Sequence, residues 1–93
     1  MALRFVWNLK KAVENERKHG VGFPEATTVF DDDLSITIPD PDHSVGEERY
    51  VLLGMSSRHR LLVVAHVEQT ESVRIISARQ ANRRERRDYE EGT

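Results

Sequence analysis

Apolar residues along the chain fall into five short stretches with the spacing of β-strands. Residues 34–38 (LSITI) alternate apolar and polar side chains, which predicts a strand with one buried face. The stretch 60–69 is apolar at both odd and even positions, so we expect a central strand covered on both faces. The loops at 57–59 and 70–72 are short enough for hairpins, which predicts antiparallel neighbours. The remaining predicted strands are 3–7, 49–56 and 72–78.

Two short helices are predicted in the N-terminal third. The first, Leu9–Lys18, follows an asparagine N-cap and precedes Gly20, a residue that adopts the left-handed conformation at helix ends with little strain. Its apolar face is expected to consist of Leu9, Ala12 and Val13. Apolar residues three and four apart over 23–30 predict the second helix, with a proline near its start.

A third helix is predicted over about 82–91, beginning at a capping box formed by Asn82 and Glu85. The predicted order is therefore β-α-α-β-β-β-β-α. Strands grouped together with helices at the ends indicate an α+β fold, with a small antiparallel sheet packed by helices on one side. At 93 residues the chain is expected to form a single domain, 1–93.

Composition narrows the possible chemistry. The chain has no cysteine, which excludes disulfides, cysteine catalysis and thiolate metal sites. It has no apolar run long enough to span a membrane and no signal-peptide pattern at its start, so we expect a cytoplasmic protein without a membrane partner. Histidine pairs with metal-ligand spacing are absent from the sequence, so neither a metal site nor a cofactor is predicted.

Charge is unevenly distributed, although the net charge is only −2. Residues 31–48 hold seven acids and no lysine or arginine, whereas residues 74–87 hold six arginines and one acid. In the last predicted helix, arginines come early and acids late, which opposes the helix dipole. Its inward face would carry only Ala81, Glu85 and Tyr89. Two interpretations remain open from these residues: a solvated basic face, or a site for an anion such as phosphate.

Two polar residues lie within apolar strands. His66 shares a face with Leu62 and Val64, so it is either a satisfied core histidine or a general acid or base. Arg74 is either a solvent-facing residue or a residue that points at an anion over the sheet. The pattern alone does not choose between these alternatives.

Motifs along nearly the whole chain resemble the BrnT toxins of bacterial type II toxin–antitoxin systems. They are KHGV-F-EA--VF-D (18–32), D-DHS-GE-R (40–49), GMSSRHRLLVV-H (54–66) and R-ISAR-A-RRER--YE (74–90). The resemblance implies a fold similar to the RelE-type ribonucleases and a metal-independent endoribonuclease that inhibits translation. It also implies a BrnA-like antitoxin of ribbon-helix-helix type, through which the complex would contact operator DNA indirectly.

The resemblance also suggests site residues. Catalytic candidates are His66, Arg74, Arg79, Glu85 and Tyr89. Candidates for binding RNA or antitoxin are His19, Arg60, Arg83, Arg84, Arg86 and Arg87.

RNA cleavage without a metal needs a base, a cation at the phosphate and an acid. Glu85 or His66 could be the base, Arg74 and Arg79 could hold the phosphate, and Tyr89 or His66 could be the acid. The alternative is a catalytically inactive interaction module that acts only as antitoxin partner and co-repressor. Direct sequence-specific DNA binding is less favoured, because the sequence has no helix-turn-helix signature.

Overall fold

The computed structural model describes residues 3–40 and 48–92, so most of the predicted loop 39–48 lies outside the described residues. The elements in chain order are β1 (Phe5–Val6), α1 (Leu9–His19), α2 (Phe23–Thr27), the 3-10 helix η1 (Thr28–Asp31), β2 (Ile36–Pro39), β3 (Arg49–Met55), β4 (Leu61–Glu68), β5 (Val73–Gln80) and α3 (Arg83–Glu91). The α+β class and the predicted order are confirmed. The second predicted helix is split, because its last turn tightens into η1.

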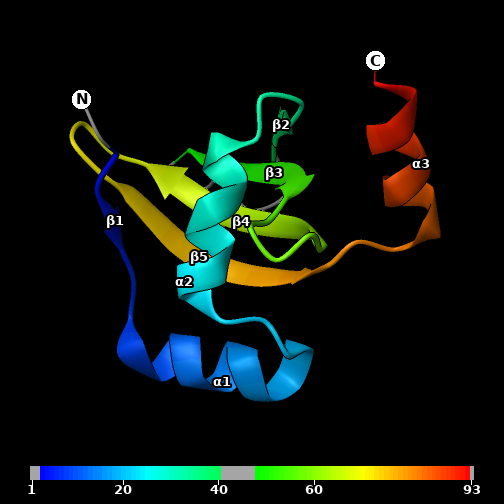
Figure 1. Cartoon of the computed structure of the whole chain (residues 1–93). Helices are drawn as coiled ribbons and strands as arrows, with labels where there is room; N and C mark the ends of the chain where they lie inside the picture. Colours follow the sequence, from blue (N-terminus) through cyan, green and yellow to red (C-terminus); the bar gives the residue numbers. More distant parts are fainter. Residues whose placement is uncertain (1–2, 41–47, 93) are drawn as a thin grey trace.

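The strands form one sheet in the order β1-β5-β4-β3-β2 (Figure 1). Strands β2 to β5 pair antiparallel, and the hairpin lengths predicted this for the β3–β4 and β4–β5 pairs. Strand β1 instead lies parallel to β5, with Phe5 opposite Val73 and Val6 opposite Arg74. The sheet is therefore mixed, and the expectation of a wholly antiparallel sheet was wrong at this edge. The chain leaves β1 through two helices rather than a hairpin, which permits the parallel pairing.

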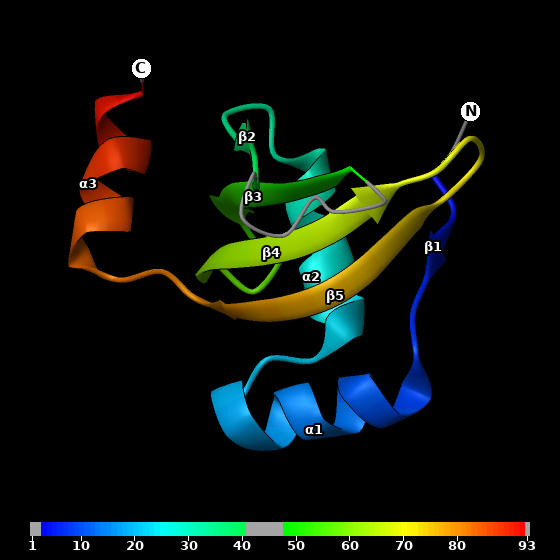
Figure 2. The ribbon, with the colours of Figure 1, turned by 180° about the vertical axis from the view of Figure 1, so that it is seen from behind.

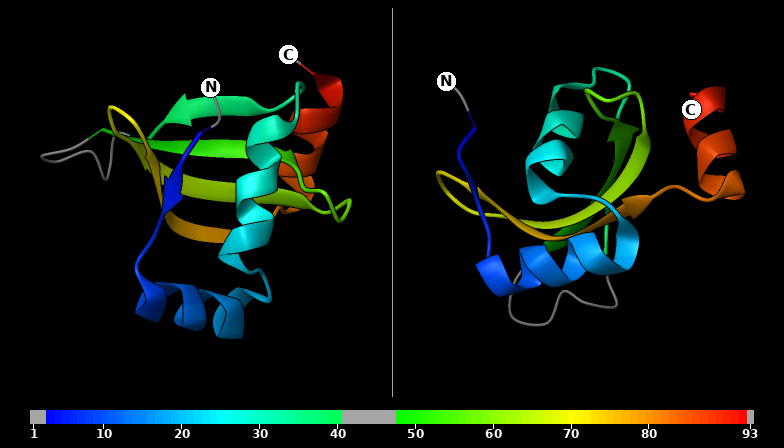
Figure 3. Two further views of the ribbon diagram at one scale, coloured as in Figure 1. Left: turned by 60° about the vertical axis from the view of Figure 1, so that its left-hand side comes forward. Right: turned by 60° about the horizontal axis from the view of Figure 1, so that its bottom comes forward.

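The helices lie on both sides of the sheet. In the left view of Figure 3, α2 stands in front of the strands, α1 lies below them and α3 stands behind them. Seen from behind, the strands lie in front of α2, and α3 stands beside their ends (Figure 2). The expectation that all helices would pack on one side was wrong for α3. That helix has no buried residue, so it lacks the apolar stripe that would direct it to the main core.

The core fills the space between the sheet and the layer formed by α1, α2 and η1. Its fully buried side chains include Phe23 and Val29 from the helical layer and Leu62, Val64 and Ile75 from the sheet. Strand β4 is buried along most of its length on both faces, which confirms its predicted central position. The helical layer thus packs on one face, and the other face of β4, which includes Val63, lies toward α3.

Two apolar rows that the pattern assigned to the interior are exposed. On α1, Leu9 and Val13 are 77% and 61% exposed, while Ala12 packs against the core. In the segment 34–38, Leu34 is 72% and Ile38 is 55% exposed. Strand β2 is the edge of the sheet, and its apolar row lies on the face opposite the main core. The predicted burial of these rows was therefore wrong within this chain.

A β-bulge interrupts β5 and changes which of its residues face the core. The register runs from Ser77 opposite Ala65 to Ile75 opposite His66, so β5 has one extra residue at this point. As a result Ile75 and Ala78, three positions apart, both belong to the core. Without the bulge, strict alternation would turn Ala78 outward.

Asn15 joins α1 to the part of β5 that has no neighbouring strand on this side. Its side-chain amide donates to the carbonyl oxygens of Val21 (3.0 Å) and Ala78 (2.8 Å), and its Oδ1 accepts from the Ala78 N–H (3.1 Å). Strand β1 pairs only with Val73 and Arg74, so it does not reach this part of β5. Asn15 therefore satisfies buried backbone groups that no strand covers.

We predict that Asn15→Ala lowers the free energy of unfolding by about 1–3 kcal/mol, because it leaves buried backbone groups without partners. Urea unfolding followed by circular dichroism measures the change. Glu14→Ala, at an exposed position on the same helix, is the matched control and should change stability little. Equal stability of the two variants would contradict this assignment.

Candidate functional site

Arg79 and Glu85 form a two-pronged ion pair where β5 leads into α3. Arg79 Nη1 donates to Glu85 Oε1 and Nη2 donates to Oε2, each at 2.8 Å. The Arg79 side chain is 42% exposed and that of Glu85 is 25% exposed. This parallel fork is the geometry in which a guanidinium also binds phosphate. An anion-binding group is therefore present, and a carboxylate of the same chain occupies it.

Glu85 has a second task as part of the helix cap. Its Oε1 accepts from the Asn82 N–H (2.9 Å), while Asn82 Oδ1 accepts from the Glu85 N–H (2.8 Å). The predicted capping box is thus confirmed. The Arg79 guanidinium, more than the cap, holds the pKa of the Glu85 carboxyl below its ordinary value despite partial burial. The same pairing raises the pKa of Arg79.

Tyr89 anchors the other half of α3. Its hydroxyl donates to Asp32 Oδ2 at 2.6 Å, across 57 positions of sequence. Asp32 Oδ2 also accepts from the Met55 N–H (2.7 Å), and its Oδ1 accepts from the Leu34 N–H (3.0 Å). Burial alone would raise the pKa of Asp32, but these donors hold it below its ordinary value. The hydrogen bond to Asp32 raises the pKa of Tyr89 to about 12.

The inward face of α3 is the predicted one. Ala81, Glu85 and Tyr89 are half-buried, whereas the remaining side chains of the helix are exposed. The exposed set includes the four arginines proposed to bind RNA or antitoxin, Arg83, Arg84, Arg86 and Arg87. Since α3 has no buried residue, the fork to Arg79 and the hydrogen bond to Asp32 are its main described attachments.

Arg74 lies on the same face of β5 as Arg79. Arg79 opposes Val63 and Arg74 opposes Val67 in the register of β4, and neither valine belongs to the main core cluster. Directly opposed residues in an antiparallel pair share a face. The bulge makes this possible, because Arg79 would otherwise share a face with buried Ile75. Arg74 is half-buried and has an interaction partner of its own.

His66 lies on the opposite face of the sheet, away from the fork. It is fully buried and packs edge-on against Phe30, with the ring centroids 4.9 Å apart. Its Nδ1 is 3.4 Å from the Val64 carbonyl, and its Nε2 is 3.6 Å from Glu68 Oε1. Burial lowers the pKa of His66, which favours the neutral ring. The structure therefore places His66 in the core and apart from Arg79, Glu85 and Tyr89.

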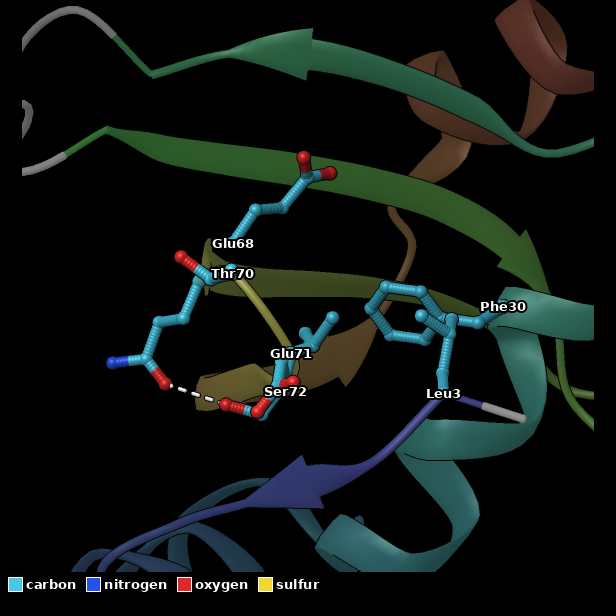
Figure 4. Close-up of a pocket in the computed structure, with 8 residues that line it drawn as sticks. Leu3, Phe30, Glu68, Thr70, Glu71 and Ser72 are labelled. Carbon is cyan, nitrogen blue, oxygen red and sulfur yellow. Dashed lines mark hydrogen bonds between the residues drawn. The ribbon is translucent and has the colours of Figure 1, made fainter. Parts of the chain in front are cut away.

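A cavity of about 390 Å³ lies near His66, at the β4–β5 hairpin (Figure 4). Phe30 and Glu68 line it together with Leu3 and Glu71, and the Ser72 hydroxyl donates to the side chain of Gln69 beside it. The carboxylates at its wall would repel a phosphate. This cavity is separate from the arginine fork and is unsuited to the same ligand.

Arg60 is engaged in a structural network that sequence reasoning missed. Its guanidinium pairs with Glu25, its Nη2 donates to the Gly20 carbonyl (3.1 Å), and Ser56 Oγ donates to the same carboxylate (2.7 Å). The side-chain hydrogen bond from Arg60 lowers the pKa of buried Glu25. His19 lies in the last turn of α1, beside Gly20. Arg60 thus ties α2 to the β3–β4 hairpin and the end of α1.

Asp32 was also missed as a site residue. It belongs to the acidic run 31–48, which offered no reason to single out one carboxylate. A possible signal was its position at the end of an apolar helical pattern. Within residues 3–40 and 48–92, no group of three or more His, Asp or Glu side chains is placed to hold a metal ion. In the same ranges no helix has the length and apolar character needed to cross a membrane.

Comparison with known proteins identifies the family. The family model described as "Ribonuclease toxin, BrnT, of type II toxin-antitoxin system" matches residues 7–85. The chain belongs to the BrnT family of ribonuclease toxins. The expected enzyme class is thereby confirmed, and membership of a toxin–antitoxin family implies an antitoxin partner. The match includes Arg74, Arg79 and Glu85 and stops before Tyr89.

The fold agrees with a solved member of the BrnT family. The chain superposes on the crystal structure of the ribonuclease toxin BrnT of Brucella abortus with a TM-score of 0.68. The two share 18% identity, and the match covers 88% of this chain and all of the Brucella chain. At this identity the likeness supports the fold alone. A search of curated protein sequences gave no match.

We predict that the phenol of Tyr89 titrates late. The Asp32 hydrogen bond stabilises the neutral phenol, so this contribution is complete below the ordinary pKa of 10.0 and is lost as pH rises through about 12. Phenolate absorbance during an alkaline titration measures this step. Because the Glu48 hydrogen bond also raises the pKa of Tyr50, the titration is read in Tyr50→Phe, where Tyr89 is the one remaining tyrosine of the sequence. Adding Asp32→Asn to that variant should return the step toward 10.0, and an unchanged late step would count against the anchor.

Proposed function

We propose that this chain is a metal-independent endoribonuclease that cleaves RNA at the Arg79–Glu85 fork and thereby inhibits translation in the cytoplasm. The observation that carries the proposal is the fork itself, a guanidinium with phosphate-binding geometry held at the exposed end of β5. It occurs in a chain of a ribonuclease toxin family. Residues 1–93 would act as one toxin domain, and a RelE-like mechanism remains part of this proposal.

The fork suggests how substrate binding could activate the base. A phosphate that takes both prongs of Arg79 would displace the Glu85 carboxylate. Loss of the guanidinium would remove the main influence that lowers the pKa of Glu85, so the carboxylate becomes more basic. Binding of the substrate phosphate would therefore free the Glu85 carboxylate, which then removes the proton from the 2′-hydroxyl of the substrate.

The reaction would then follow three coupled changes. Glu85 takes the proton of the 2′-hydroxyl, the 2′-oxygen bonds to phosphorus, and the bond from phosphorus to the 5′-oxygen breaks. Arg79, with Arg74 on the same strand face, offsets the charge that develops on the phosphorane. Tyr89, one helical turn beyond Glu85, supplies a proton to the leaving 5′-oxygen or stacks on a base. His66 has no step in this scheme, because it is buried on the other face.

The remaining cations would have a binding role. Arg83, Arg84, Arg86 and Arg87 are exposed on α3 and would attract the RNA backbone or the antitoxin. We further propose that the antitoxin is BrnA-like and of ribbon-helix-helix type, and that operator DNA is contacted only through it. Arg60 and His19 would contribute at most to the binding surface, since Arg60 is held by Glu25.

A second candidate is the catalytically inactive interaction module. The observation that favours it is the occupied fork, because Glu85 blocks Arg79 in the described structure. Incubating the purified chain with RNA and EDTA separates the two candidates. Cleavage that persists in the chelator supports the metal-independent nuclease. Antitoxin binding without any cleavage supports the module.

We predict that Arg79→Ala lowers RNA cleavage by about 10²–10³-fold, because the phosphate loses its preorganised charge. Arg79→Lys should also be impaired, since lysine keeps the charge and loses the fork. Single-turnover cleavage of a defined RNA measures the rates, with circular dichroism to verify folding. Arg17→Ala, at an exposed position on α1, is the matched control and should retain most activity. Full activity of Arg79→Ala would remove Arg79 from the mechanism.

We predict that Glu85→Gln separates binding from cleavage. The amide cannot accept the 2′-hydroxyl proton, so cleavage should fall by about 10²–10⁴-fold. It also competes less well for Arg79, so RNA should bind at least as tightly as it does to the unchanged protein. Fluorescence anisotropy with a 2′-deoxy-blocked RNA measures binding. Weakened binding together with lost cleavage would indicate that Glu85 only positions Arg79.

A further inference from the structure

The apolar row of β2 has the pattern of a buried strand face and is not buried. Leu34 and Ile38 are largely exposed, although they alternate with polar residues as core-facing residues do. Ile36, Val51 and Leu53 continue the same face into the sheet, since Ile36 opposes Leu53 and Ile38 opposes Val51. The folded chain therefore presents a contiguous apolar surface on the face that α3 only partly covers.

This surface is hollowed on both sides of Ile36. One cavity of about 160 Å³ is lined by Ile36, Ile38, Val51, Leu53 and Val63 with two carboxylates of α3. A second cavity of about 390 Å³ lies between Leu34 and the end of α3. Ile36 lines both, so the two cavities are neighbours, and we call them together the β2–α3 trough. It could accept a few apolar side chains of another molecule.

The rim of the trough is acidic. Glu85 and Asp88 border the first cavity, and Asp33 and Glu90 border the second. Arg79 compensates Glu85, but none of the described residues forms an ion pair with Asp88. An apolar floor with a surplus of carboxylates is complementary to a segment that carries both apolar and basic side chains. It would repel an RNA phosphate.

We propose that the β2–α3 trough binds a segment of the antitoxin that presents two or more apolar side chains and at least one lysine or arginine. This inference rests on the proposed function for its partner. The exposed α1 row of a second copy, Leu9 and Val13 with Lys10 and Lys11, has similar chemistry. That contact would join two different surfaces and would not close a dimer, which argues against a second copy as the occupant.

The test uses the full chain and the antitoxin encoded by the neighbouring gene. Leu34→Ser/Ile38→Ser removes exposed apolar groups of the trough, and Asp88→Lys reverses a rim charge. Each should raise the dissociation constant for the antitoxin about tenfold or more. The matched controls are Leu9→Ser/Val13→Ser and Glu14→Lys, which make the same kinds of change on α1. Isothermal titration calorimetry measures affinity, and sedimentation measures self-association of each variant.

The possible outcomes distinguish failure of the trough proposal from failure of the proposed function. Weaker antitoxin binding in the trough variants alone supports the proposal. Unchanged binding in all variants overturns it while leaving the toxin–antitoxin function intact. A wild-type oligomer that is lost in both the trough and the α1 doubles would identify a second copy as the occupant and also overturn it. If the unchanged protein does not bind the antitoxin, the proposed partner fails and the inference fails with it.

Discussion

The β-bulge in β5 is the constraint on which the arrangement of this protein depends. It allows Ile75 and Ala78 to enter the same core although they are three positions apart. Ala78 then offers its backbone to Asn15, which fixes α1 against the sheet edge. The same extra residue turns Arg79 to the opposite face, where Glu85 meets it. One inserted residue thus serves core packing, helix attachment and the candidate site together.

The attachment of α3 has energetic consequences for the site. A partly exposed ion pair such as Arg79–Glu85 contributes about 1 kcal/mol or less to stability, and a single hydrogen bond to Asp32 adds a similar amount. With no buried residue, α3 has little apolar surface to oppose its release. A helix held in this way can leave Arg79 without disturbing the main core. Such weak polar anchoring suits a site whose guanidinium must exchange a carboxylate for a phosphate.

Local patterns predicted the elements well, and distant contacts explain where prediction failed. The asparagine cap, the Gly20 stop and the Asn82–Glu85 capping box depend on neighbours within a few positions, and the structure contains all of them. The Tyr89–Asp32 bond spans 57 positions and the Arg60–Glu25 pair spans 35, so no spacing rule could reveal either. Alternation placed His66 correctly on one face with Leu62 and Val64, but it does not reveal which elements cover each face, so the separation of His66 from the fork could not be predicted.

The same helix links the candidate site to the trough. Glu85 borders the cavity beside β2 and also occupies the fork of Arg79. A segment bound against Glu85 and Asp88 would add contacts to α3 only while that helix stays docked. By linkage, such binding favours the docked helix, and the docked helix keeps the carboxylate on Arg79. A partner in the trough could therefore suppress phosphate binding without covering Arg79. In this arrangement, the degree to which the partner inhibits RNA cleavage would depend on how firmly it holds α3 in place, and not on how much surface it buries over Arg79.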